Sequence, residues 1–138
     1  MKVAIWGARG SIATPGQATV RYGGNTACVS TPLPDGSVLV LDAGTGIRRL
    51  GNALLREQPV VAHLFLSHCH WDHIQGFPFF APAYVAQTQL RIYGYAAARR
   101  KIRKTMTDQM EGAYFPVDFS ALSASIEFID MEDHSVTL

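Results

Sequence analysis

Short apolar runs separated by Gly, Pro and Asp alternate along this chain with two stretches of helical spacing. The runs have strand length and are rich in apolar and β-branched residues, a pattern typical of buried or half-buried strands. The predicted strands cover residues 3–6, 27–31, 37–41, 61–67, 89–93 and 125–130. Apolar positions three or four residues apart predict helices over 46–56 and 96–110. Strands and helices mixed in this order indicate a layered α/β domain.

A Pro-Leu-Pro-Asp-Gly turn at 32–36 joins two of these strands into a predicted hairpin. The hairpin carries Asp42 to the end of its second strand. Asp42 then has two interpretations, an ordinary turn aspartate ahead of Gly44 or a carboxylate that orients nearby metal ligands. Thr45 follows as the expected N-cap of the helix over 46–56.

The composition supports one globular domain. The 138 residues are 48% hydrophobic, and 12 Lys and Arg against 11 Asp and Glu give a net charge of +1. This length suits a single domain, and so small a charge gives no global attraction to nucleic acid or to anionic membranes. No apolar run is long enough to span a bilayer. Two cysteines without a secretory pattern predict a reducing, cytoplasmic setting.

The strongest chemical signal is the six-residue stretch 68–73, which directly follows the predicted strand over 61–67. It contains three imidazoles and one carboxylate, His68, His70, Asp72 and His73, and this is the ligand set that zinc and similar divalent ions prefer. Manganese or iron would also accept these ligands. A histidine-rich turn without metal is the alternative. A structural zinc site is disfavoured, because such sites usually use cysteine pairs.

The spacing within this stretch favours two neighbouring metal ions. His68 and His70 are two residues apart, so in extended backbone they point to the same side and can hold one ion. A turn at Trp71 would let Asp72 and His73 reach a second ion nearby. Four ligands shared by two ions leave open positions, which distinguish a catalytic zinc from a structural one.

Neighbouring positions have simpler expected roles. The intervening Cys69 should point away from the ligands and be buried, and His63 should be a partly exposed structural histidine. The glycine-rich connection over 7–16 is either a backbone loop that approaches a substrate phosphate or a plain connector. The aromatic residues over 76–84 form either core packing or a wall for a substrate ring. The basic cluster over 99–104 is a solvated face or a local guide for a polyanion.

The pattern His68-x-His70-x-Asp72-His73 after an apolar strand resembles the signature of the metallo-β-lactamase superfamily. The segments 7–12, 21–26, 41–48, 70–77 and 114–117 resemble its phosphodiesterase-like branch, which includes the tRNA 3′-processing endonucleases and the cyclic-nucleotide phosphodiesterases. The resemblance implies the N-terminal half of a four-layer αββα sandwich.

Further expectations come from this resemblance. It implies that Asp42 orients the ligand loop without being a ligand, and that Arg21 or Asn25 contacts substrate. The superfamily's later ligand segments, a histidine, a bridging aspartate and a last histidine, have no counterpart after His73. We therefore expect residues 1–138 to be a single, truncated domain. We also expect its unpaired sheet face to self-associate or to pack on a missing C-terminal half.

The function predicted from these observations is a metal-dependent hydrolase, in particular a phosphodiesterase in which two zinc ions activate water. His68, His70, Asp72 and His73 would be the metal ligands, and Asp72 would also be catalytic. The substrate would be a small-molecule or nucleotide phosphodiester; the net charge does not indicate nucleic acid. The alternatives are a thioester or lactone hydrolase and an inactive metal-binding or oligomerising module.

Overall fold

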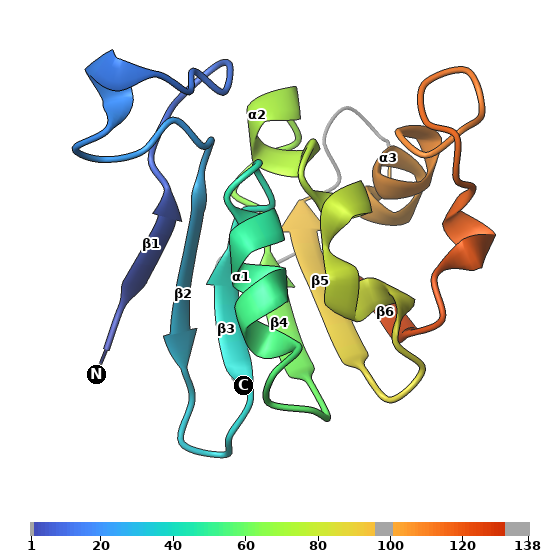
Figure 1. Cartoon of the computed structure of the whole chain (residues 1–138). Coiled ribbons are helices and arrows are strands. Elements are labelled where there is room, and N and C mark those ends of the chain that lie inside the picture. The colour runs from blue at the N-terminus through green and yellow to red at the C-terminus, as the bar shows by residue number, and fades with distance from the viewer. Residues whose placement is uncertain (1, 96–100, 132–138) are drawn as a thin grey trace.

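The computed structural model describes residues 2–95 and 101–131, which form one six-stranded mixed sheet with helices (Figure 1). The strands are β1 (Ala4–Gly7), β2 (Cys28–Pro32), β3 (Val38–Leu41), β4 (Val61–Phe65), β5 (Gln89–Tyr95) and β6 (Ser125–Met131). They lie side by side in chain order. β1, β2 and β3 pair antiparallel, whereas β3 to β6 pair parallel. All six predicted strands are present, and the α/β fold class is confirmed.

The helices are short. The α-helices are α1 (Ile47–Leu54), α2 (Trp71–Ile74) and α3 (Ile102–Asp108), and the 3₁₀-helices are η1 (Gln17–Thr19), η2 (Phe77–Phe79), η3 (Ala81–Tyr84) and η5 (Phe119–Ala121). The prediction of a helix over 96–110 is confirmed in part by α3, and residues 96–100 lie outside the described residues. No described helix is both long and apolar enough to cross a membrane.

The prediction that Thr45 caps α1 is wrong. Gly46 is the N-cap residue, and no side chain bonds the first turn. The Thr45 hydroxyl instead accepts a hydrogen bond from the backbone N–H of Thr26, at 2.9 Å. The Thr45 hydroxyl oxygen, which would accept a hydrogen bond from the helix if Thr45 were the cap, is thus bonded to the backbone of Thr26. Thr45 therefore connects two loops.

The core lies between one face of the sheet and the helices. Alternate residues of each strand point to this face, so their side chains meet α1 and α3. Its fully buried side chains include Val40, Ala62, Leu64, Leu90 and Ile92 of the sheet, with Ile47 and Leu50 of α1 and Ile102 and Met106 of α3. The aromatic segment over 76–84 mostly belongs to this core, since Phe77 and Phe80 are buried while Phe79 is 53% exposed.

The opposite sheet face holds a ring cluster around Tyr93. Phe65 stacks on Tyr93 with ring centroids 4.1 Å apart, and the His63 Nδ1 lies 3.0 Å from the Tyr93 hydroxyl. His63 is only 5% exposed. The expectation of a partly exposed histidine is therefore wrong, because the neighbouring strand supplies an aromatic cover and a hydrogen-bond partner that the sequence of β4 does not show.

The parallel pairing places three strand ends at one edge. β3, β4 and β5 run in the same direction, so their carboxyl ends and the segments that follow them meet there. The Asp42 N–H donates to the Phe65 carbonyl at 2.9 Å, and the Ala43 N–H donates to the His73 carbonyl at 2.7 Å. These bonds fix the segment after β3 against the segment after β4. Loops at this edge are the usual place for a site in an open sheet with parallel strands.

Candidate metal centre

The stretch 68–73 leaves the end of β4 in extended backbone and turns at Trp71 into α2. His70 is the extended N-cap residue of α2, and the His73 N–H donates to the His70 carbonyl at 2.9 Å. Asp72 and His73 therefore lie in the first turn of α2, on the segment that follows His68 and His70. The turn expected at Trp71 is present, and Trp71 is the first residue of the four-residue helix α2.

The three imidazole rings lie next to one another. The ring centroid of His68 is 4.4 Å from that of His70 and 4.0 Å from that of His73. The His73 Nε2 is 3.3 Å from the Asp72 Oδ2. The two expected pairs, His68 with His70 and Asp72 with His73, thus form one cluster at the sheet edge. His68 and His70 are exposed and Asp72 and His73 are partly buried, so the cluster is open to solvent.

Asp42 holds the loop and one of its histidines. Its Oδ2 lies 2.9 Å from the His73 Nδ1, and its Oδ1 accepts the Ser67 N–H at 2.8 Å. The Ser67 hydroxyl is 2.9 Å from both carboxylate oxygens. A carboxylate at Nδ1 fixes the ring orientation and favours the tautomer with its lone pair on Nε2, the nitrogen that is then available to a metal. This contact agrees with an orienting role for Asp42, which stays a prediction.

Asp42 also has an unusual backbone. Its φ is 63°, in the left-handed region, where side chains other than Asn and Asp are strained. The chain needs this conformation to leave β3 and present the carboxylate to Ser67 and His73. Asp is among the few residues that tolerate it while supplying the acceptor oxygens.

Ser11, which the sequence analysis did not single out, reaches the cluster. Its backbone N–H donates to the Asp72 Oδ2 at 2.8 Å, across 61 residues of sequence, and its φ of 66° is also left-handed. This hydrogen bond, with the charges of His73 and His68, lowers the pKa of the Asp72 carboxyl below its ordinary value. The glycine-rich loop therefore holds the side chain of Asp72, the acidic candidate ligand. In the sequence, the only sign of a special role for Ser11 is its place next to Gly10, and this does not indicate which residue it contacts.

Two threonines bind the surrounding loops together. The Thr45 N–H donates to the Thr26 Oγ1 at 2.8 Å, and the Thr26 N–H donates back to the Thr45 Oγ1 at 2.9 Å. Thr26 is fully buried. Gly44 makes this packing possible, because a Cβ there would meet the Asp72 carbonyl oxygen and would lie 2.5 Å from the Thr26 Oγ1. The backbone of the segment that carries the candidate ligands thus packs directly on Gly44.

The two expected substrate-contacting residues lie differently. The Asn25 Oδ1 accepts a hydrogen bond from the Thr45 hydroxyl at 3.2 Å, and its carbonyl accepts the Ala8 and Arg9 N–H groups at 3.1 and 3.0 Å. Asn25 therefore shapes the loops. Arg21 is exposed, with its guanidinium 5.1 Å from the Tyr22 ring centroid, and within residues 2–95 and 101–131 no contact joins it to the histidine cluster. A substrate role for either residue stays a prediction.

The model of the "Metallo-beta-lactamase superfamily" family matches residues 23–122, which is well over half of the chain. The chain belongs to the metallo-beta-lactamase superfamily. The match includes Asp42, the four candidate ligands and β2 to β5.

A solved structure shows the same fold. The metallo-beta-lactamase fold protein YhfI from Bacillus subtilis aligns with a TM-score of 0.57 and 19% sequence identity. The alignment covers 99% of this chain and 47% of that chain, so this chain spans about half the length of the neighbour. Comparison with curated proteins finds no match.

Members of the superfamily bind metal ions, often zinc, and the donor chemistry of this cluster fits such an ion. Three imidazoles lie side by side, Asp42 fixes one of them through Nδ1, and a carboxylate adjoins the same ring. Within the described part of the chain, however, no group of three or more His, Cys, Asp or Glu side chains is arranged to hold an ion. That the four candidate residues are metal ligands therefore stays a prediction.

The cysteine between the ligands is half-buried. Cys69 packs against the core and Cys28 is fully buried, and both are free thiols. Burial, reinforced by the charge of Asp42, raises the pKa of Cys28 to about 12 and also raises the pKa of Cys69. Protonated thiols are poor metal ligands, so both cysteines have packing roles.

Proposed function

We propose that this chain is the metal-binding part of a metal-dependent hydrolase, and that its substrates are phosphodiesters. The observation that carries the proposal is the cluster of His68, His70, Asp72 and His73, with Asp42 on the Nδ1 of His73. A divalent ion, when bound, supplies Lewis-acid polarisation and makes water a stronger nucleophile near neutral pH. We propose zinc as the ion, with two sites in the complete fold; manganese and iron suit the same donors.

In this proposal each residue has a defined role. His68 and His70 hold one ion, and Asp72 and His73 contribute to the second. Asp42 keeps the His73 ring in position, with its Nδ1 2.9 Å away. The Ser11 N–H anchors one oxygen of Asp72 at 2.8 Å. The Asp72 carboxylate accepts a hydrogen bond from the attacking water and so aims its lone pair at the substrate.

The preference for phosphodiesters rests on the motifs that resemble the phosphodiesterase-like branch. The glycine-rich loop adds to it only indirectly. Its Ala8 and Arg9 N–H groups are bonded to the Asn25 carbonyl, and its Ser11 N–H is bonded to Asp72. These amides are therefore occupied, and the loop acts on the ligand Asp72. A thioester or lactone would be attacked at carbon by the same centre, so substrate comparison has to separate these classes.

A metal-binding module without catalysis is the second candidate. Within the described residues no three potential ligands are arranged to hold an ion, which argues against catalysis by this chain alone. The exposed apolar side chains Ile5 and Leu41, 70% and 45% exposed, favour association through the sheet, with a second copy or with a C-terminal half. The free cysteines agree with a cytoplasmic location. Size-exclusion chromatography with light scattering tests the association, and a monomer at high concentration would contradict it.

The function is tested by measuring metal content and turnover on the same preparations. We expect the zinc-loaded chain, or a longer form that contains it, to hydrolyse bis(p-nitrophenyl) phosphate faster than a thioester or a lactone. Asp72→Ala should abolish this turnover, while Asp118→Ala, a matched change at a remote exposed aspartate, should leave it unchanged. Unaltered turnover in Asp72→Ala at saturating zinc would refute the assigned role. Bound zinc without turnover in every form would support the module instead.

A further inference from the structure

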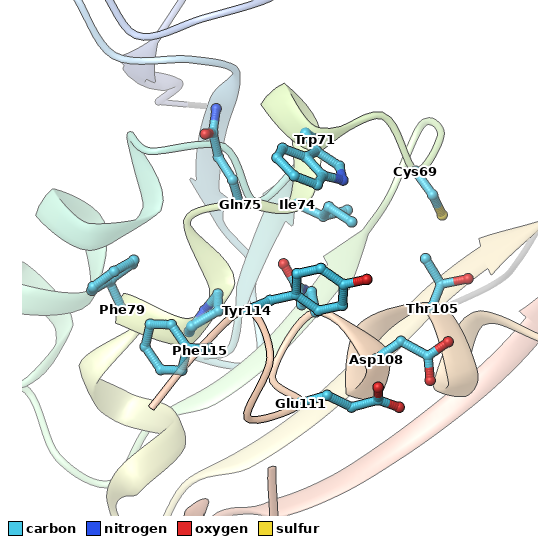
Figure 2. A pocket seen from close by; sticks show the side chains of 12 residues that line it. Cys69, Trp71, Ile74, Gln75, Phe79, Thr105, Asp108, Glu111, Tyr114 and Phe115 are labelled. Atoms are coloured by element: carbon cyan, nitrogen blue, oxygen red, sulfur yellow. The ribbon is translucent and has the colours of Figure 1, made fainter. Parts of the chain in front are cut away.

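A second feature lies behind the metal-binding loop. A cavity of about 550 Å³ opens between α2 with η2 on one side and α3 with the segment that follows it on the other (Figure 2). Cys69, Trp71, Ile74 and Gln75 line it; Cys69 and Trp71 alternate along the chain with His68, His70 and Asp72, and Ile74 and Gln75 follow His73. The candidate ligands of this segment therefore form the histidine cluster, while the side chains between and after them line the cavity. A group bound in the cavity would lie next to the candidate metal centre.

The cavity carries negative charge. Its lining includes the carboxylates of Asp108 and Glu111, and none of its lining residues is Lys, Arg or His. Asp108 accepts a hydrogen bond from the Lys104 Nζ at 3.0 Å, and the Lys104 side chain is 62% exposed on the outside of α3. For Glu111 no ion pair with another described residue is found. An anionic group, such as a second phosphate, would be repelled from this cavity.

Aromatic side chains form much of the remaining wall. Trp71, Phe79 and Tyr114 are 77%, 53% and 72% exposed, so large apolar surfaces face solvent around the opening. The Phe79 ring meets the Phe115 ring edge-on, with centroids 5.3 Å apart. In the view of Figure 2 the Trp71 ring lies above the Tyr114 ring, and the Glu111 carboxylate lies below Tyr114. Aromatic faces beside carboxylates, without competing basic residues, are the surroundings that organic cations prefer.

We propose that this cavity binds an organic ammonium group. The aromatic rings contact its alkyl surface and attract its charge, and Glu111 supplies the complementary negative charge, whereas Asp108 is already paired with Lys104. Where the proposed hydrolase function holds, on which this step alone rests, the ammonium belongs to the substrate. The substrate is then a phosphodiester whose anionic phosphorus faces the histidine cluster and whose cationic substituent enters the cavity.

The direct test is binding without metal or turnover. Choline and its uncharged isostere 3,3-dimethylbutanol are titrated against the chain, with the Trp71 indole resonance followed by NMR and assigned with Trp71→Phe. We expect choline to shift this resonance, and the isostere to bind about two- to fivefold more weakly, as the energy of an exposed cation–π contact predicts. Glu111→Gln should weaken choline binding and leave the isostere unchanged. Glu127→Gln, a matched change in the exposed Arg91 ion pair of β6, should change neither.

Equal affinity for choline and the isostere, or no choline-dependent shift up to its solubility limit, would overturn the proposal. Turnover then separates it from the hydrolase function. With the zinc-loaded chain, or with a longer form that contains it, p-nitrophenyl phosphorylcholine should have a higher kcat/KM than p-nitrophenyl 3,3-dimethylbutyl phosphate, and Glu111→Gln should remove the difference. Choline binding with no turnover of either ester would refute the hydrolase and leave the ammonium site standing. Equal turnover of both esters without choline binding would refute the ammonium site and leave the hydrolase function standing.

Discussion

Asp42 offers the sharpest test of how the site is held, because its backbone and its side chain contribute separately. The side chain accepts hydrogen bonds from the Ser67 N–H and hydroxyl and contacts the His73 Nδ1, all within 2.8–2.9 Å. The backbone has a φ of 63°. We compare Asp42→Ala, Asp42→Gly and Asp42→Asn. Ala loses both contributions, Gly loses only the side chain, and Asn keeps the backbone preference and one acceptor oxygen.

The expected magnitudes follow from these contacts. A hydrogen bond to a charged group contributes about 1.5–3 kcal/mol, and partial solvent access at this edge of the sheet puts the combined loss in Asp42→Gly at about 2–3 kcal/mol. The left-handed backbone costs a non-glycine residue about 1–2 kcal/mol, partly offset by the greater freedom of glycine when unfolded. Asp42→Ala should therefore be less stable than Asp42→Gly by about 0.5–1 kcal/mol. Asp42→Asn should lose about 1–2 kcal/mol.

Urea unfolding followed by circular dichroism measures these differences, and zinc titration of the same variants measures the effect on metal binding. Loss of an orienting carboxylate typically weakens a metal site 10–100-fold, and we expect a change of this size for Ala and Gly. The reasoning would be refuted if the free energies of unfolding of both the Ala and the Gly variant lay within about 0.5 kcal/mol of that of the wild-type chain. A glycine variant less stable than the alanine variant would refute the backbone part alone.

The remaining predictions concern packing, pH and thiol reactivity. Gly44→Ala should destabilise the chain by about 3 kcal/mol or more in urea unfolding, because its Cβ would meet the Asp72 carbonyl oxygen; a loss under about 1 kcal/mol would contradict the close approach. Burial lowers the pKa of His63, so the free energy of unfolding should fall as the pH drops below about 6.5, and His63→Gln should flatten that profile. At pH 8 a disulfide reagent should modify Cys69 in the native chain and Cys28 only on unfolding, since Cys28 is fully buried with its pKa raised to about 12; two equally fast thiols would contradict this.

The sequence by itself determined the strands, the fold class and the candidate ligands. Apolar runs of strand length located all six strands within a few residues, because burial on one or both faces of a sheet dictates side-chain type locally. The candidate ligands of the stretch 68–73 could be predicted because all four belong to one short segment. The family match over residues 23–122 agrees with that reading.

Tertiary structure decided everything that depends on partners far away in the chain. The Ser11 N–H meets Asp72 across 61 residues, and the Thr45 hydroxyl bonds Thr26 instead of capping α1. His63 is buried because Tyr93, from the neighbouring strand, stacks beside it and meets its Nδ1. The sequence does not indicate which distant residue a hydrogen-bond donor or an aromatic ring will contact. Periodicity therefore shows which side of an element a residue faces, and only the packed chain shows what it meets there.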